Sequence, residues 1–224
     1  MSDLKSQREH IRQEQLRRIK QRNIIFLIGG LAVIVLALLA FVLPKLGGSA
    51  ERYQNQAGFS VGDPNAPVKV EEYSNFTCSH CRTFALDTEA DFINKYVDTG
   101  KVYLTFRNFP FQNDTTANAV EATYCAEEQN AVWQLKHKMF QFSSYSGGFA
   151  DSNLIKYAGE IGMDTKAFKD CLDSNRFVPQ IAAAREYAIG QKIEFTPSFV
   201  VNGQINFSDT LETAVDSELA ALGQ

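Results

Sequence analysis

Two cysteines lie two residues apart within the stretch EEYSNFTCSHCRTF, residues 71–84. They are Cys78 and Cys81, and His80 stands directly before the second. Sulfurs at this spacing can hold a metal ion, form a structural disulfide, or exchange electrons with the thiols of other proteins. The choice depends on the elements around the pair and on the compartment in which it works.

The flanking residues predict that the pair begins a helix. In VKVEEYS, residues 68–74, apolar and polar side chains alternate at the start and the first residue is β-branched, which is typical of a strand. Residues 78–97 have apolar side chains at helical spacing: Phe84, Leu86, Phe92, Ile93 and Tyr96. We therefore expect Cys78 Sγ at a helix N-terminus. There, unpaired N–H groups and the helix dipole favour an anion and lower the pKa of a thiol.

This position predicts different roles for the two sulfurs. Cys78 is the attacking thiolate, and His80 can donate to it or favour it electrostatically. Cys81 is the less exposed resolving thiol, which attacks a mixed disulfide between Cys78 and a client. A zinc site is disfavoured because it needs four ligands and Cys125 and Cys171 stand elsewhere in the chain. A copper carrier and an inert disulfide are further alternatives, although so short a loop stabilises little. We expect no metal and no cofactor.

The remaining pattern is α/β. Residues 101–111 predict a second strand, and residues 195–207 predict a hairpin that turns at Asn202-Gly203. Between them the spacing predicts helices over 114–130, 131–143, 151–161, 164–174 and 177–191, and a last helix covers 208–222. The order is strand-helix-strand, a helical block, then strand-strand-helix.

Residues 24–43, IIFLIGGLAVIVLALLAFVL, carry no charge. As a helix they would span roughly 30 Å, the thickness of a bilayer core. Residues 1–23 carry seven Lys/Arg against three acids, so the N-terminus is expected in the cytoplasm and the rest outside it. A cleaved signal peptide and a buried core helix are the alternatives. We expect a retained single-pass anchor in the cell membrane.

Export has consequences for the cysteines and for the partners. Outside the cytoplasm thiols tend to form disulfides, so the four cysteines are two potential pairs with three possible connectivities. The net charge of −4 minus the +4 of residues 1–23 leaves −8 for the remainder. Such an acidic body argues against nucleic acid as a partner.

The chain resembles the DsbA-like thiol–disulfide oxidoreductases over residues 58–222. The resemblance rests on VEEYSNFTCSHC, the late FTPSF and two further cysteines in the helical block. It implies a thioredoxin fold with an inserted all-helical subdomain, after a single transmembrane helix. The expected parts are a basic tail (1–23), the span (24–43), a linker (44–60), the thioredoxin core (61–111 and 193–224) and the insertion (112–192). Ser79 is a departure, since the best-known oxidases of the family have proline there.

The resemblance also implies roles for an acid and a proline. Glu72 shares a strand face with Val68 and Val70, and in the family a buried acid here assists proton transfer at the resolving cysteine. From the residues alone Glu72 is equally a solvated strand residue, with Glu71 as the rival. Pro197 corresponds to a cis-proline that faces the cysteine pair, and the backbone of Thr196 before it would pair with a bound client.

Cys125 and Cys171 belong to separate predicted helices of the insertion. Joined, they would form a structural disulfide with no part in turnover. Free buried cysteines, packed as small apolar groups, are the alternative.

Together these features predict an extracytoplasmic thiol oxidase that introduces disulfides into exported proteins through Cys78 and Cys81. The family implies exported client proteins with free thiols and a quinone-linked membrane partner that reoxidises the pair. A reductase or isomerase that keeps client thiols reduced is the alternative. A non-catalytic binding module is a third possibility.

Overall fold

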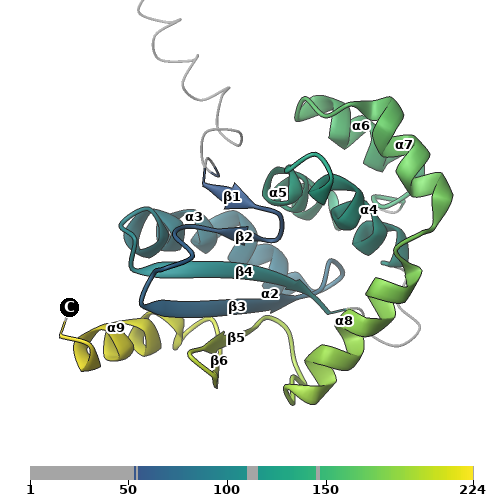
Figure 1. Cartoon of the computed structure of the whole chain (residues 1–224). Coiled ribbons are helices and arrows are strands. Elements are labelled where there is room, and N and C mark those ends of the chain that lie inside the picture. The colour runs from purple at the N-terminus through teal and green to yellow at the C-terminus, as the bar shows by residue number, and fades with distance from the viewer. Residues whose placement is uncertain (1–52, 54, 110–115, 145–146, 224) are drawn as a thin grey trace, which may run out of the picture. The chain divides into compact units, whose positions relative to one another are not determined.

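The computed structural model describes residues 53, 55–109, 116–144 and 147–223. Within them, six strands form one sheet in the order β1-β2-β4-β3-β5-β6 (Figure 1). The strands are β1 (Gln56–Ala57), β2 (Ser60–Val61), β3 (Val68–Ser74), β4 (Val102–Asn108), β5 (Ser198–Val201) and β6 (Gln204–Asn206). The helices are α2 (Ser79–Thr83), η1 (Phe84–Thr88), α3 (Glu89–Phe92), η2 (Ile93–Val97), α4 (Ala117–Glu127), α5 (Val132–Phe142), α6 (Asp151–Glu160), α7 (Thr165–Ser174), α8 (Val178–Gly190) and α9 (Leu211–Ala221).

The centre of the sheet follows the predicted order. Strands β3 and β4 run parallel and are joined by the helical stretch from α2 to η2. Alternate residues of β4 are buried, as in a strand that turns one face to the core. Strand β5 pairs antiparallel with β3 and continues into β6 through Asn202 and Gly203, both at positive φ. Such turns match the twist of hairpin strands, and the predicted hairpin is confirmed.

The segment predicted as one α-helix over 78–97 is helical but not regular. It contains two π-helical turns, η1 and η2. The apolar spacing could not reveal them, because Phe84, Phe92 and Ile93 are buried as a plain α-helix would bury them. Turns of this kind are rare and occur often at functional sites.

Residues 55–61 form a short hairpin where the sequence predicted the end of a linker. Strand β1 pairs with β2, and β2 pairs with β4. Tyr53 is 1% exposed. Strands of two residues offer no alternation to detect, so the folded unit begins earlier than expected. The earlier part of the predicted linker lies outside the described residues.

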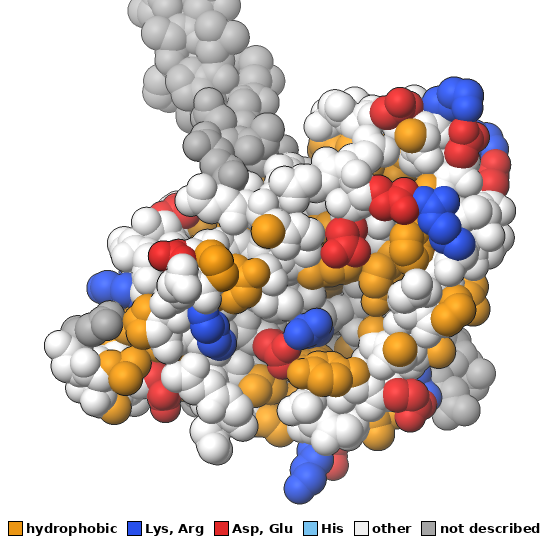
Figure 2. All heavy atoms as spheres, in the orientation of Figure 1, with side chains coloured by type: hydrophobic (Ala, Val, Ile, Leu, Met, Phe, Trp, Pro, Cys, Tyr) orange, Lys and Arg blue, Asp and Glu red, His pale blue; other side chains and the backbone are white. Residues whose placement is uncertain are grey.

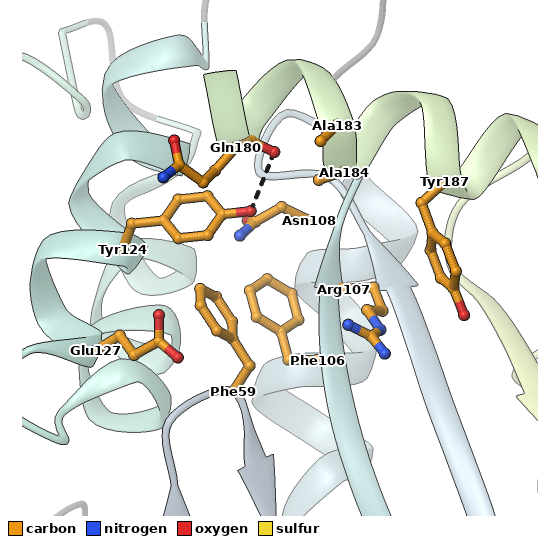
Figure 3. Close-up of a pocket in the computed structure, with 10 residues that line it drawn as sticks. All are labelled: Phe59, Phe106, Arg107, Asn108, Tyr124, Glu127, Gln180, Ala183, Ala184 and Tyr187. Atoms are coloured by element: carbon orange, nitrogen blue, oxygen red, sulfur yellow. Dashed lines mark hydrogen bonds between the residues drawn. The ribbon is translucent and has the colours of Figure 1, made fainter. Parts of the chain in front are cut away.

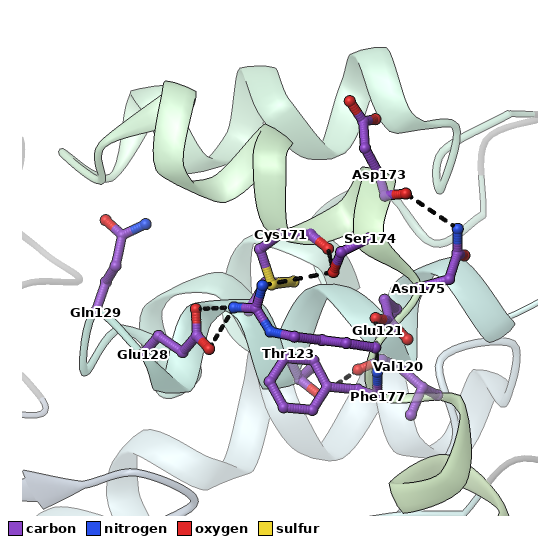
Figure 4. The surroundings of a disulfide bond; sticks show 12 residues. Val120, Glu121, Thr123, Glu128, Gln129, Cys171, Asp173, Ser174, Asn175 and Phe177 are labelled. Atoms are coloured by element: carbon purple, nitrogen blue, oxygen red, sulfur yellow. Dashed lines mark hydrogen bonds and ion pairs between the residues drawn. A yellow bond between two sulfur atoms is a disulfide. The ribbon is translucent and has the colours of Figure 1, made fainter.

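The helical block contains the helices predicted for it, α4 to α8, with their ends shifted by a few residues. Cys125 on α4 and Cys171 on α7 are joined in a disulfide, with Cα atoms 5.8 Å apart (Figure 4). Ser174 Oγ donates to the Cys171 carbonyl beside it. The covalent link joins α7 to α4, the first helix of the block.

No helix in the described part of the chain is long and apolar enough to cross a bilayer. Residues 24–43, the predicted span, lie outside the described residues.

Candidate active site

Cys78 is the N-cap residue of α2. Its backbone is extended, at φ −79° and ψ 120°, and its Sγ accepts a hydrogen bond from the Cys81 N–H at 3.3 Å. The sulfur is half-buried, and as a thiol it donates to the Thr196 carbonyl at 3.1 Å. The strand-to-helix junction thus places the sulfur where free helix amides point.

This environment lowers the pKa of Cys78 from 9.0 to about 5. The largest cause is a hydrogen bond from the Cys81 thiol, and the backbone N–H groups of Cys81 and His80 add to it, against the opposing effect of partial burial. At neutral pH the reduced Cys78 is therefore a thiolate, the form that attacks disulfides.

Cys81 has the opposite properties. Its side chain is 0% exposed, and its Sγ accepts a hydrogen bond from the Asn75 N–H at 3.5 Å. Burial is the main reason that the pKa of Cys81 is raised. The reduced pair is therefore one accessible thiolate beside one buried thiol.

Ser79 and His80 lie between the two cysteines, and both are exposed. No hydrogen bond among the described residues joins the imidazole of His80 to Cys78 Sγ; the contribution of His80 to the site comes from its backbone N–H.

The Thr196–Pro197 peptide bond is cis. Pro197 is buried, and the Thr196 carbonyl faces Cys78 Sγ. Phe195, directly before them, is 64% exposed. A polar backbone edge and an open aromatic side chain therefore stand beside the accessible sulfur.

Glu72 is inside the protein, on the face of β3 that also buries Val68 and Val70. Lys136 Nζ donates to its Oε2 at 2.6 Å, and Lys136 also pairs with Glu89. Burial raises the pKa of Glu72 to about 7, although the Lys136 ammonium acts against this shift. Its rival Glu71 lies on the other face and pairs with Arg107.

Sequence reasoning missed Lys136 and Glu89. A signal was present: Lys136 lies within the apolar stripe of its helix, four residues after Val132 and three before Met139. A lysine at such a position is buried only when it is paired, which predicts an acidic partner in the core.

A separate cavity of about 360 Å³ lies between the end of β4 and the helical block (Figure 3). Phe59, Phe106 and Tyr124 form aromatic walls, and Tyr187 stands at one end. Figure 2 shows this face of the molecule, with hydrophobic side chains gathered between the sheet and the helices. The residues that line this cavity do not include Cys78, Cys81, Thr196 or Pro197.

Comparison with known proteins identifies the family of this chain. The family model described as Thioredoxin matches residues 54–217. The chain is 30% identical over 206 residues to "Probable disulfide bond formation protein D" of Bacillus anthracis, covering 88% of this chain and 94% of the relative.

Solved structures show the same fold. DsbA of Chlamydia trachomatis is similar with a TM-score of 0.66 at 22% identity, covering 73% of this chain and 92% of that one. Oxidised BdbD of Bacillus subtilis gives 0.65 at 22% identity, over 75% and 94%. The predicted thioredoxin-like α/β fold with a helical insertion is confirmed. The chain belongs to the DsbA-like thioredoxin-fold family and is a protein thiol–disulfide oxidoreductase.

Proposed function

We propose that this enzyme is a thiol oxidase that works outside the cytoplasm, is tethered by residues 24–43, and introduces disulfides into exported proteins. The observation that carries the proposal is the stabilised thiolate of Cys78 beside the buried thiol of Cys81. Stabilising the reduced form makes the corresponding disulfide a stronger oxidant. The name of the relative in Bacillus anthracis, a probable disulfide bond formation protein, also supports oxidation of client thiols as the direction of exchange.

The exchange has two steps. A client thiolate attacks Cys78 Sγ of the Cys78–Cys81 disulfide, a mixed disulfide forms, and Cys81 leaves and takes up a proton. A second client thiolate then attacks the client sulfur of the mixed disulfide, and Cys78 leaves as its stabilised thiolate. The client loses two electrons and the enzyme gains them. A quinone-linked membrane partner then reoxidises the pair.

Three further groups have places in this scheme. The partly exposed backbone edge at Thr196, before the buried Pro197, receives the backbone of the client next to Cys78, and the exposed Phe195 offers it an apolar contact. Glu72 exchanges a proton with Cys81. Its pKa near neutrality suits either direction of transfer.

The deciding experiment is the equilibrium of the full chain, in detergent, with reduced and oxidised glutathione. We expect a potential of about −120 to −180 mV, the range of strong protein oxidants. A potential near about −270 mV, as in thioredoxin, would overturn the oxidase proposal and favour a reductase.

A further inference from the structure

Three charged side chains form a buried cluster between the thioredoxin core and the helical block. Lys136 comes from α5, Glu72 from β3 and Glu89 from α3, and each is 0% exposed. Lys136 Nζ lies 2.6 Å from Glu72 Oε2 and is also paired with Glu89 Oε1. The insertion thus supplies the cation for two acids of the core.

The surroundings of the cluster are otherwise apolar or neutral. Lys136 Nζ lies 4.7 Å from the ring centre of Phe106 and 4.6 Å from that of Trp133. On the neighbouring strand β5, Phe199 stands opposite Glu72. Among the described residues, Lys136 and Glu89 are the charged groups that face Glu72 at this site. Cys81 on α2 is the nearby thiol on the same side of the sheet.

The charges do not balance if every group is ionised. Two carboxylates and one ammonium would leave a buried charge of −1, and an uncompensated buried charge is strongly unfavourable. One proton therefore belongs to the cluster.

The hydrogen bonds indicate where that proton resides. Both oxygens of Glu89 are engaged, because Tyr53 donates to Oε2 at 3.1 Å while Lys136 holds Oε1. Glu72 Oε1 has no hydrogen-bond partner among the described residues. Glu72 is thus the carboxyl group with an unsatisfied oxygen, and we assign the proton to it.

We propose that Lys136 and Glu89 are positioning residues that set the protonation of Glu72 in opposite directions. The ammonium favours the Glu72 carboxylate, and the Glu89 charge favours its protonated form. The inference extends the proposed function by making the helical insertion part of the proton supply to Cys81.

One hydroxyl group stands on the same strand face as Glu72 and beside the resolving cysteine. Ser74 follows Glu72 by two residues on the same face of β3, and its buried hydroxyl interacts with the Cys81 thiol, where it opposes the rise in the pKa of Cys81. When Cys81 leaves the disulfide as a thiolate, it takes the Glu72 proton, and Lys136 stabilises the transient carboxylate until Glu72 takes up a proton from solvent. The reduced enzyme then holds a Cys81 thiol and a protonated Glu72, one proton more than the oxidised enzyme. In reoxidation Glu72 first releases its proton to solvent and then accepts the proton of Cys81 before Cys81 attacks.

The test is the midpoint of the Glu72 titration, measured by NMR on the full chain labelled with ¹³C at the glutamate carboxyls. The Glu72→Gln variant identifies the signal by its loss. We expect Glu89→Gln to lower the midpoint and Lys136→Met to raise it, each by about one pH unit or more. Lys136→Arg keeps the positive charge, so its Glu72 midpoint should lie closer to that of the unaltered chain than the midpoint of Lys136→Met does. Lys138→Met is the matched control, because Lys138 lies on the same helix but pairs with Glu160 near the surface.

Shifts of the Glu72 midpoint in opposite directions in Glu89→Gln and Lys136→Met distinguish an electrostatic role of the two residues from a merely structural one. A midpoint that Glu89→Gln leaves unchanged or raises overturns the inference. This variant keeps a neutral Glu72–Lys136 pair, so it decides the question even if Lys136→Met does not fold. In folded variants, the pH midpoint for the release of Cys81 from the Cys78–Cys81 disulfide, when a thiol attacks Cys78, should follow the Glu72 midpoint. The glutathione potential of the unaltered chain tests the oxidase proposal separately, since either measurement can fail while the other stands.

Discussion

The molecule contains two cysteine pairs whose surroundings give them different chemistry. Cys78 and Cys81 lie at the start of a helix, and one of the two sulfurs is accessible. Cys125 lies near the end of α4 and Cys171 in the second half of α7; they are 1% and 2% exposed and are separated by 46 positions in the sequence. The comparison shows that helix position and loop length decide what a cysteine pair does.

Loop length separates the energetics of the two pairs. A disulfide stabilises a protein mainly by restricting the unfolded chain, and this effect grows with the length of the loop. The long loop of Cys125–Cys171 therefore stabilises the fold, whereas the short loop of Cys78–Cys81 contributes little. The short pair is free to open and close during turnover.

The largest effects should come from the reactive pair. We expect Cys78→Ser to abolish oxidation of a reduced client protein, because the attacked sulfur is gone. Cys81→Ser should instead accumulate a covalent mixed disulfide with a thiol client, since the resolving thiol is missing. Non-reducing gels and mass spectrometry measure both outcomes. Turnover by Cys78→Ser above the uncatalysed rate would contradict the assignment of the attacking sulfur.

The structural pair should show the reverse behaviour. The Cys125→Ala, Cys171→Ala double variant should keep its exchange rate but lose about 4 kcal/mol of unfolding free energy, from the closure entropy of its loop. Urea unfolding of the oxidised proteins provides the measurement. An unchanged stability would remove the energetic contrast between the pairs, and a lost exchange rate would remove the functional one.

Reduction of the reactive pair should stabilise the protein instead of weakening it. The pKa of Cys78 is depressed to about 5 in the folded state, so the stability gained from its thiolate is fully present above the ordinary value of 9.0 and is lost as the pH falls through 5. Unfolding midpoints of the reduced and oxidised forms should therefore converge toward pH 5. Conditions that leave Cys125–Cys171 intact are required.

The same titration should appear in the redox potential. Above pH 5, reduction takes up two electrons and one proton, because Cys78 remains a thiolate while Cys81 is protonated. The potential should then fall by about 30 mV per pH unit above pH 5, and by about 59 mV per unit below it. A slope of about 59 mV throughout the neutral range would show that both sulfurs are protonated and that the pair is electrostatically ordinary.

Much of the fold could be predicted because its signals are local. The alternation of β3, the helical spacing after Cys78 and the Asn202-Gly203 turn each depend on neighbouring residues. The hairpin of β1 and β2 could not, since it is held by pairing with the distant strand β4. Lys136 and Glu89 were missed for a related reason. A buried charge is understood only when its partner is known, and the partner here is 64 residues away for Glu72 and 47 for Glu89.

The smallest effect should belong to His80, which lies inside the reactive pair. The sequence favoured a role for its imidazole, but this ring is exposed, and the hydrogen bonds to the thiolate come from the Cys81 thiol and from the backbone N–H groups of Cys81 and His80. An exposed charge contributes roughly 0.2–1 kcal/mol, so His80→Gln should raise the pKa of Cys78 by well under one unit. Thiolate absorbance at 240 nm, titrated in reduced wild type and variant, measures the difference. A much larger rise would mean that the imidazole, and not the Cys81 thiol and the helix amides, is the main cause of the low pKa of Cys78.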